Sequence, residues 1–190
     1  MASWIMVLRD SSAMFETDAE LAELQSLLDD SLASATEHLQ SIFTPGQRVL
    51  TAAQVTAVCG GMCTLAISTV TARGEPRVSA VDGHLLHGRW YFSTARGAAK
   101  ARHLAVRPAV SIAYLRGEEI GVFAHGTAQP MNPAGGPDDP DWPALLAYMT
   151  DYYESSPLSW GDVIYYRLIP SWMVAFASNP ADLMAKLAAG

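Results

Sequence analysis

A cluster of cationic side chains is the feature of this sequence that most directly indicates chemistry. Eight of the twelve lysine and arginine residues lie between residues 73 and 116, although the whole chain carries a formal charge of −7. Only Glu75 and Asp82 oppose them within that stretch. Because like charges repel, a cluster of this density is typical of a site that faces an anion. The alternative is a solvated basic face that is merely contiguous in sequence.

Residues 93–100 of this cluster have the composition of a turn that enters a helix. The segment Ser-Thr-Ala-Arg-Gly-Ala-Ala-Lys combines two hydroxyl side chains, a glycine and a lysine. A helix N-terminus offers unpaired backbone N–H groups and the positive end of the helix dipole, and both suit a phosphate. The segment therefore predicts a phosphate site at Lys100, one of only two lysines in the chain. A surface lysine, with ordinary turn chemistry at Ser93 and Thr94, is the alternative.

The bulk composition limits the class of protein and of ligand. Half of the 190 residues are apolar and 16% are charged, so the chain can bury the core of one domain. A nucleic-acid binder needs a broadly basic surface, which the net charge argues against. No apolar run approaches the length of a membrane span, and the apolar stretch at residues 4–8 is too short for a signal peptide. We therefore expect a cytoplasmic protein with a small-molecule partner and no nucleic-acid or membrane partner.

Other reactive side chains carry weaker signals. The two cysteines, Cys59 and Cys63, are too few for a zinc site and are expected to be buried, reduced thiols. The histidines are scattered, and none pairs at metal-ligand spacing. Neither Ser79 nor Ser93 lies in the elbow motif that accompanies a nucleophilic serine. We therefore expect no metal site and name no catalytic residue.

Local patterns predict helices at the beginning of the chain. A capping box at Thr17 and Glu20 precedes leucines at helical spacing, which predicts one or two amphipathic helices over residues 19–43. A second box at Thr51 and Gln54 opens a short helix that the glycines at 60 and 61 end.

After residue 61 the sequence changes to runs of β-branched residues that are separated by turns containing glycine or proline. Strands are predicted at residues 63–71, 76–86, 90–94, 110–115, 120–129, 163–169 and 173–177, with a break at Pro170 and Ser171. Short helices are predicted at 98–106, 144–154 and 181–188. Six or seven antiparallel strands with few helices between them favour a closed or nearly closed Greek-key barrel, because closure removes exposed sheet edges.

Several short pieces also occur in an order and spacing that resemble a known family. They are residues 64–70, 74–79, 90–94, 99–104, 107–110 and 126–128, with further likeness at 138–141 and 166–170. Across residues 50–178 the chain resembles the flavin/deazaflavin oxidoreductases of the pyridoxamine 5′-phosphate oxidase-like group. The first 45 residues carry no such resemblance.

The resemblance implies a mainly β (α+β) fold: a six- to seven-stranded antiparallel split β-barrel, the FMN-binding split barrel, with peripheral helices. It divides the chain into an N-terminal helical extension, 1–45, and a split-barrel cofactor-binding domain, 46–190. It also implies a homodimer with two cofactor sites between the subunits. The cofactor expected first is the deazaflavin coenzyme F420, and the alternative is FMN.

The resemblance also assigns roles to residues. The implied cofactor-binding set is Lys100, Arg77, Val78, Ser79, Ser93, Thr94, Ala95, Arg96, Ala99, Arg167 and Trp172. Lys100 would hold the cofactor phosphate with Ser93 and Thr94. The strand that begins at Arg77 would line the ring and the ribityl chain. Arg167 and Trp172 would reach the cofactor from the second subunit.

These expectations combine into one predicted function with two alternatives. The chain is expected to be an oxidoreductase that transfers hydride from F420 to a small unsaturated or aromatic substrate. The first alternative is an FMN-binding flavoprotein of the pyridoxamine phosphate oxidase type. The second is a non-catalytic cofactor carrier or sensor, in which the N-terminal helix docks a partner instead of packing on the barrel.

Overall fold

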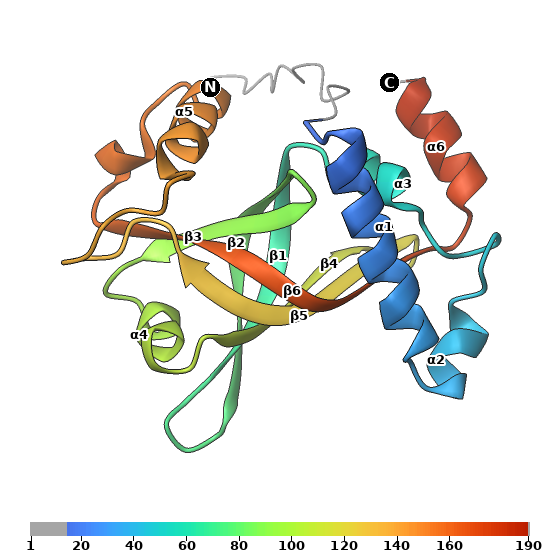
Figure 1. The fold of residues 1–190 in the computed structure, drawn as a ribbon, viewed down its shortest axis with the longest axis horizontal. Coiled ribbons are helices and arrows are strands. Elements are labelled where there is room, and N and C mark those ends of the chain that lie inside the picture. The colour runs from blue at the N-terminus through green and yellow to red at the C-terminus, as the bar shows by residue number, and fades with distance from the viewer. Residues whose placement is uncertain (1–14, 190) are drawn as a thin grey trace, which may run out of the picture.

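Six antiparallel strands close into a barrel in the order β1-β2-β3-β6-β5-β4 (Figure 1). The computed structural model describes residues 15–189. The strands are β1 (Met62–Val70), β2 (Pro76–Leu86), β3 (Arg89–Ala95), β4 (Ala109–Arg116), β5 (Ile120–Pro130) and β6 (Val163–Ala177). Closure pairs β1 with β4 and β3 with β6, but β3 pairs only with residues 83–86 of β2, so one edge of β2 over residues 76–82 is not paired with another strand. The predicted six- to seven-stranded antiparallel barrel with peripheral helices is confirmed.

The β1–β2 hairpin is the longest local pairing and extends away from the body of the barrel. Its register runs from Met62 opposite His84 to Val70 opposite Pro76. Gly74 lies in the turn with a φ of +79°, a backbone conformation that residues other than glycine rarely adopt. In Figure 1 the tip of this hairpin points away from α5 (Trp142–Tyr152) and α6 (Pro180–Ala188). The outer half of β2 is therefore exposed.

β6 is one continuous strand, and the predicted break at Pro170 and Ser171 is wrong. His125 of β5 lies opposite Trp172 and Gly126 lies opposite Pro170, so Ser171 is the extra residue of a β-bulge. Proline has no N–H to donate to a neighbouring strand, and a β-bulge is one of the places where a strand tolerates this, so β6 continues through Pro170. A Cβ atom on Gly126 would lie 2.1 Å from the Ile169 carbonyl oxygen, so the close approach of the two strands requires glycine.

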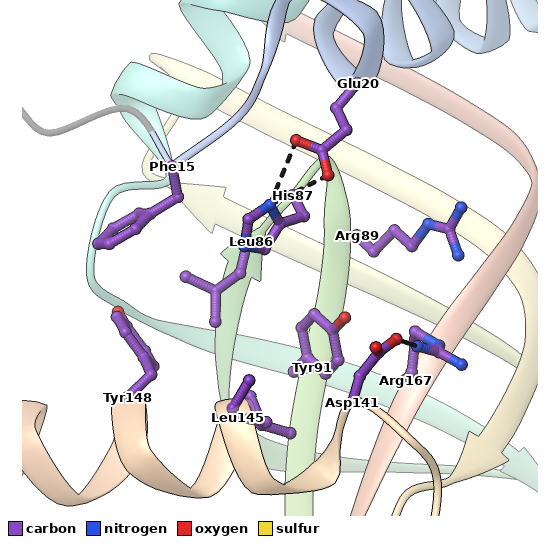
Figure 2. Close-up of a pocket in the computed structure, with 11 residues that line it drawn as sticks. Phe15, Glu20, Leu86, His87, Arg89, Tyr91, Asp141, Leu145, Tyr148 and Arg167 are labelled. Carbon is purple, nitrogen blue, oxygen red and sulfur yellow. Dashed lines mark hydrogen bonds and ion pairs between the residues drawn. The ribbon is translucent and has the colours of Figure 1, made fainter.

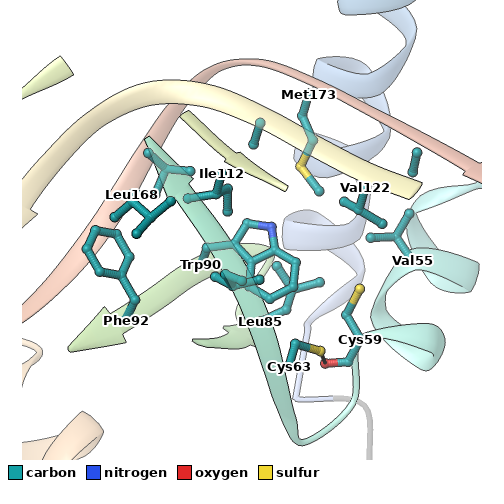
Figure 3. Close-up of a cluster of buried hydrophobic side chains, with 14 of the residues drawn as sticks. Val55, Cys59, Cys63, Leu85, Trp90, Phe92, Ile112, Val122, Leu168 and Met173 are labelled. Atoms are coloured by element: carbon teal, nitrogen blue, oxygen red, sulfur yellow. Dashed lines mark hydrogen bonds between the residues drawn. The ribbon is translucent and has the colours of Figure 1, made fainter. Parts of the chain in front are cut away.

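The barrel interior holds the main hydrophobic core (Figure 3). Side chains alternate along each strand, so that Trp90 and Phe92 point inward while Tyr91 points outward. Cys59 and Cys63 lie at one end of this core, and both are free thiols and buried, as predicted.

The N-terminal helices cover one end of the barrel. α1 (Asp18–Ala33) begins at the predicted capping box of Thr17 and buries Leu24 and Leu28 in the barrel core. The Met173 N–H of β6 donates to Ser31 Oγ at 2.9 Å. Two short helices follow, α2 (Glu37–Ile42) and α3 (Ala52–Val58). The leucine face of α1 therefore packs on the barrel and is not left open for a partner.

Two helices flank β3 and position the candidate sites. α4 (Ala99–Val106) follows β3 directly, and α5 covers the outer side of β3, where it shares a second buried cluster with Tyr91 and Tyr165. A short 3₁₀ helix, η1 (Pro157–Trp160), connects α5 to β6. α5 begins earlier than predicted because Pro143 is accepted in its first turn. Among the described residues, no helix is long and apolar enough to cross a membrane.

Candidate functional site

The predicted phosphate site lies where the start of α4 meets β2. Lys100 Nζ donates to the Ala80 carbonyl oxygen of β2 at 3.2 Å. Farther along α4, His103 Nδ1 and Thr69 Oγ1 of β1 are 2.9 Å apart. These two contacts hold α4 against the β1–β2 hairpin. The structure therefore brings Lys100 and the exposed half of β2 together, as the phosphate-site interpretation requires.

The N-terminus of α4 has no side-chain cap. Its N-cap residue is Ala98, and its first turn contains no acidic residue. By contrast, threonine hydroxyls cap α1, α2 and α3. The first-turn N–H groups of α4 are thus left available to an anion, and the helix dipole adds to the charge of Lys100. The sequence placed this helix start within one residue, since the predicted helix began at residue 98 and α4 begins at Ala99.

Ser93, Thr94 and Ala95 form the last residues of β3, immediately before the turn into α4. Ser93 pairs with Tyr165 of β6 across the sheet. Burial raises the pKa of Tyr165, and a hydrogen bond with the Ser93 side chain opposes that shift. The Ser93 hydroxyl thus already has one partner, whereas the Thr94 hydroxyl has none among the described residues. Ala99 is the first residue of α4, where its backbone N–H lies in the first turn.

The predicted ring-lining residues Arg77, Val78 and Ser79 lie on the outer half of β2. Arg77 Nη2 forms an ion pair with Glu75 Oε2 at 2.7 Å. Val78 is 72% exposed, a large apolar surface for a strand residue, while Ser79 is half-buried on the opposite face. An exposed valine next to the Ala80–Lys100 contact is the surface that a flat ring or another protein surface would cover.

Arg96 is more strongly fixed than the sequence indicated. Its Nε donates to Asp162 at 2.9 Å, and Nη2 donates to the carbonyl oxygens of Asn132 and Val163. It borders a cavity of about 830 Å³ between α4, β5 and β6, which Arg102 of α4 also borders. Lys100 does not line that cavity. Arg96 thus links the end of β3 to Asn132 and to the start of β6, and it adds positive charge close to the N-terminus of α4.

Arg167 and Trp172 lie apart from Lys100 within the subunit. Arg167 is buried on the outer side of β6, where it pairs with Asp139 at 2.8 Å and Asp141 at 2.6 Å. Trp172 stacks on His125 at 4.7 Å between ring centroids and donates to the Ser31 carbonyl oxygen. Their assignment as contacts from a second subunit stays a prediction.

A second cavity, of about 510 Å³, lies between α1, β3 and α5 and was not predicted from the sequence. Its lining residues are spread through the sequence from Phe15 to Arg167, so no local motif could identify it. Among residues 15–189, no group of three or more His, Cys, Asp or Glu side chains could hold a metal ion.

His84 of β2 is enclosed by tyrosines from the end of α5. The ring is 2% exposed, with Nε2 2.9 Å from the Tyr153 hydroxyl and Nδ1 3.3 Å from the Tyr148 hydroxyl. Tyr152 packs edge-on at 4.8 Å between centroids. Burial lowers the pKa of His84 to about 4, so the ring is neutral at physiological pH. Its hydrogen bonds to the two tyrosines hold the end of α5 against β2.

This burial predicts a defined loss of stability in acid. Between pH 6.5 and about 4, unfolded His84 binds a proton that folded His84 does not. The free energy of unfolding should therefore fall with decreasing pH by up to about 1.4 kcal/mol per pH unit from this group. Urea unfolding across that range should show a shallower slope in His84→Gln. The matched variant at the exposed His38 should keep the wild-type slope, and an unchanged slope in His84→Gln would contradict the neutral-ring assignment.

Comparisons with known proteins add a family and a fold. The model of a family described as pyridoxamine 5′-phosphate oxidase matches residues 52–158, more than half of the chain. Among curated proteins, none matches the chain.

Solved structures share the fold at low sequence identity. The conserved hypothetical protein Rv2991 of Mycobacterium tuberculosis is 16% identical with a TM-score of 0.52, over 72% of this chain and 91% of that one. General Stress Protein 26 of Bacillus anthracis is 15% identical with a TM-score of 0.50, over 65% and 91%. An F420 reductase is 18% identical, over 58% and 88%, but its TM-score of 0.45 is too low to bear on the cofactor of this chain.

Proposed function

Because the chain belongs to the pyridoxamine 5′-phosphate oxidase family, we propose that it is an oxidoreductase with a phosphate-bearing flavin-type cofactor. The cofactor proposed first is coenzyme F420, with FMN as the alternative. The proposed reaction is hydride transfer to a small unsaturated or aromatic substrate.

The uncapped N-terminus of α4 with Lys100 beside it is the observation that carries this proposal. Free N–H groups, a helix dipole and an ammonium group are what a phosphate dianion requires. The exposed part of β2 begins at the same place, so a ring attached to that phosphate could lie along Val78 and Ala80. The residues present therefore fit the cofactor class.

Additional cations near α4 support F420 over FMN. One phosphate is already served by Lys100 and the start of the helix, yet Arg102 also borders the 830 Å³ cavity beside them. Arg73, at the tip of the β1–β2 hairpin, has an 80% exposed side chain and shares the single carboxylate of Glu75 with Arg77, so the pair of arginines keeps a net positive charge. A cofactor with a longer anionic tail would use this surplus charge. Arg89 does not contribute, because it lies at the far end of β3 from α4.

The protein's own part in such a reaction is positional. A bound deazaflavin or flavin supplies the hydride chemistry, and the protein supplies orientation, charge and exclusion of water. Lys100 would hold the phosphate, and the β2 strand would support the ring. The proton that must follow the hydride onto the substrate can come from water, so we assign no catalytic residue.

A second copy of the chain is proposed to complete the site. Ala66 of β1 lies opposite both Ala80 and Ala113, so three small side chains form a row across the sheet on its outer face. Ala66 and Ala80 are exposed, and Val78 is adjacent to Ala80. A flat apolar surface of this kind, contiguous with the Lys100 contact, supports a homodimer whose interface encloses the cofactor.

A cofactor titration tests the proposal. Purified protein is mixed with F420 and, separately, with FMN, and bound cofactor is measured by fluorescence. We expect saturable binding of F420 that exceeds the binding of FMN, and light scattering of the same samples should give the mass of a dimer. Tight FMN binding without F420 binding would reverse the order of the two cofactors. Binding of neither would contradict the proposed function.

A further inference from the structure

Within the subunit, the 510 Å³ cavity lies apart from Lys100 and has its own polar groups (Figure 2); of the predicted cofactor-binding residues, only Arg167 lines it. It lies beside Arg89, at the end of β3 opposite Ser93–Ala95 and α4. Three of the residues that line it lie outside the family-matched residues 52–158: Phe15 and Glu20 precede that region in the sequence, and Arg167 follows it. The other eight residues that line the cavity, Arg89 among them, lie within the family-matched region.

One side of the cavity is aromatic and apolar. Phe15 and Tyr148 meet edge to face, with ring centroids 5.4 Å apart. Leu86, Tyr91 and Leu145 continue this surface toward the centre of the cavity in Figure 2. Edge-to-face rings beside buried aliphatic side chains form a slot that favours a flat apolar group.

The other side carries charge, and one cation there has no anionic partner in the part of the chain that the structure describes. Asp141 pairs with Arg167 at 2.6 Å, and Glu20 Oε1 lies 3.1 Å from His87 Nδ1. A backbone hydrogen bond from Thr17 lowers the pKa of Glu20, so that carboxylate is ionised at neutral pH. The side chain of Arg89 makes no hydrogen bond or ion pair within residues 15–189. In Figure 2 its guanidinium lies on the same side as Arg167, away from Phe15 and Tyr148.

We propose that this cavity binds a small aromatic carboxylate, with the ring between Phe15 and Leu145 and the carboxylate on Arg89. A guanidinium binds a carboxylate with paired, charge-assisted hydrogen bonds, and the other two charged pairs leave Arg89 as the available cation. A volume of 510 Å³ is within the usual range for small-molecule sites. The site does not depend on the proposed cofactor.

Three probes of one size separate the contributions of charge and ring. Phenylacetate carries the anion, phenylacetamide is its uncharged counterpart, and phenethylamine carries a cation. Binding to the full-length protein is measured by calorimetry. We expect saturable binding of phenylacetate, with a dissociation constant below about 10 mM, and at least about tenfold weaker binding of the other two probes. Tighter binding of the amine, or no saturable binding of phenylacetate, would overturn the proposal.

Three variants locate the site. Arg89→Gln should weaken phenylacetate binding about tenfold and leave the amide unaffected. Ala144→Trp, on the exposed side of α5 where it borders the cavity, should block binding of every probe without unfolding the protein, as circular dichroism would show. Arg116→Gln, at the far end of β4, should have no effect. Equal binding by wild type and Arg89→Gln would exclude this cavity. Lys100→Gln should bind phenylacetate normally, so this test and the cofactor test fail independently.

Discussion

Replacing Lys100 by glutamine is expected to weaken cofactor binding between about 10- and 100-fold, as measured by fluorescence titration. A hydrogen bond to a charged group contributes about 1.5–3 kcal/mol, and glutamine removes the charge while shortening the side chain by one atom. The substitution does not remove a buried contact, because Lys100 Nζ has only the exposed Ala80 carbonyl as its partner. Stability should therefore change little, and the loss should appear in binding.

The chain offers a matched control for this experiment. Lys186 is the other lysine, and it lies on α6 in an exposed ion pair with Glu119 at 3.6 Å. Lys186→Gln should bind the cofactor as the wild type does, and Lys100→Arg should recover most of the affinity because it restores the cation. If Lys100→Gln bound within twofold of the wild type, Lys100 would not be the phosphate ligand.

Replacing Arg167 by methionine is expected to lower the free energy of unfolding by about 3–5 kcal/mol in urea denaturation. The side chain of Arg167 is 10% exposed and that of its partner Asp139 is 5% exposed. Removing the guanidinium would leave the Asp139 carboxylate buried without its counter-charge. It would also release the Asp141 carboxylate, which precedes the first turn of α5.

Two further variants distinguish an ion-pair effect from a general packing effect. Arg73→Met removes a surface ion pair with Glu75 on the hairpin tip and should cost less than about 1 kcal/mol. Adding Asp139→Asn to Arg167→Met should recover part of the loss, because the buried charge is then gone. If the double variant were no more stable than Arg167→Met, the cost would come from packing and not from the unpaired carboxylate.

The Arg167 network also links stability to the proposed second pocket. Asp139 and Asp141 hold the start of α5 against β6, and α5 provides Leu145 and Tyr148 to the cavity wall. His84 locks the other end of α5 through Tyr148 and Tyr153. We therefore expect a substitution in the Arg167 ion pairs or at His84 to weaken ligand binding in the aromatic carboxylate site at a smaller perturbation than is needed to disturb the barrel.

Local features of this chain could be predicted from the sequence because neighbouring residues alone produce them. The capping boxes at Thr17 and Thr51 begin helices where expected, since each hydroxyl accepts an N–H three residues away. The turn at Gly74 joins β1 to β2 because a glycine with positive φ suits it. The prediction of Lys100 as a phosphate ligand came from the family resemblance and from the helix-start pattern together, whereas its contact with Ala80 of β2 was found only in the structure.

Long-range features depended on the tertiary structure. Periodicity could not show that β6 continues through Pro170, since the bulge opposite Gly126 exists only once β5 and β6 are paired. It could not place Arg167, because the carboxylates that neutralise it lie more than twenty residues away in sequence. The sequence by itself determined the helix starts, the hairpins and the cationic segment, which depend on short-range sterics and hydrogen bonds. Only barrel closure decided which cations meet an anionic partner among residues 15–189 and which, like Lys100 and Arg89, meet none there and are available to a ligand.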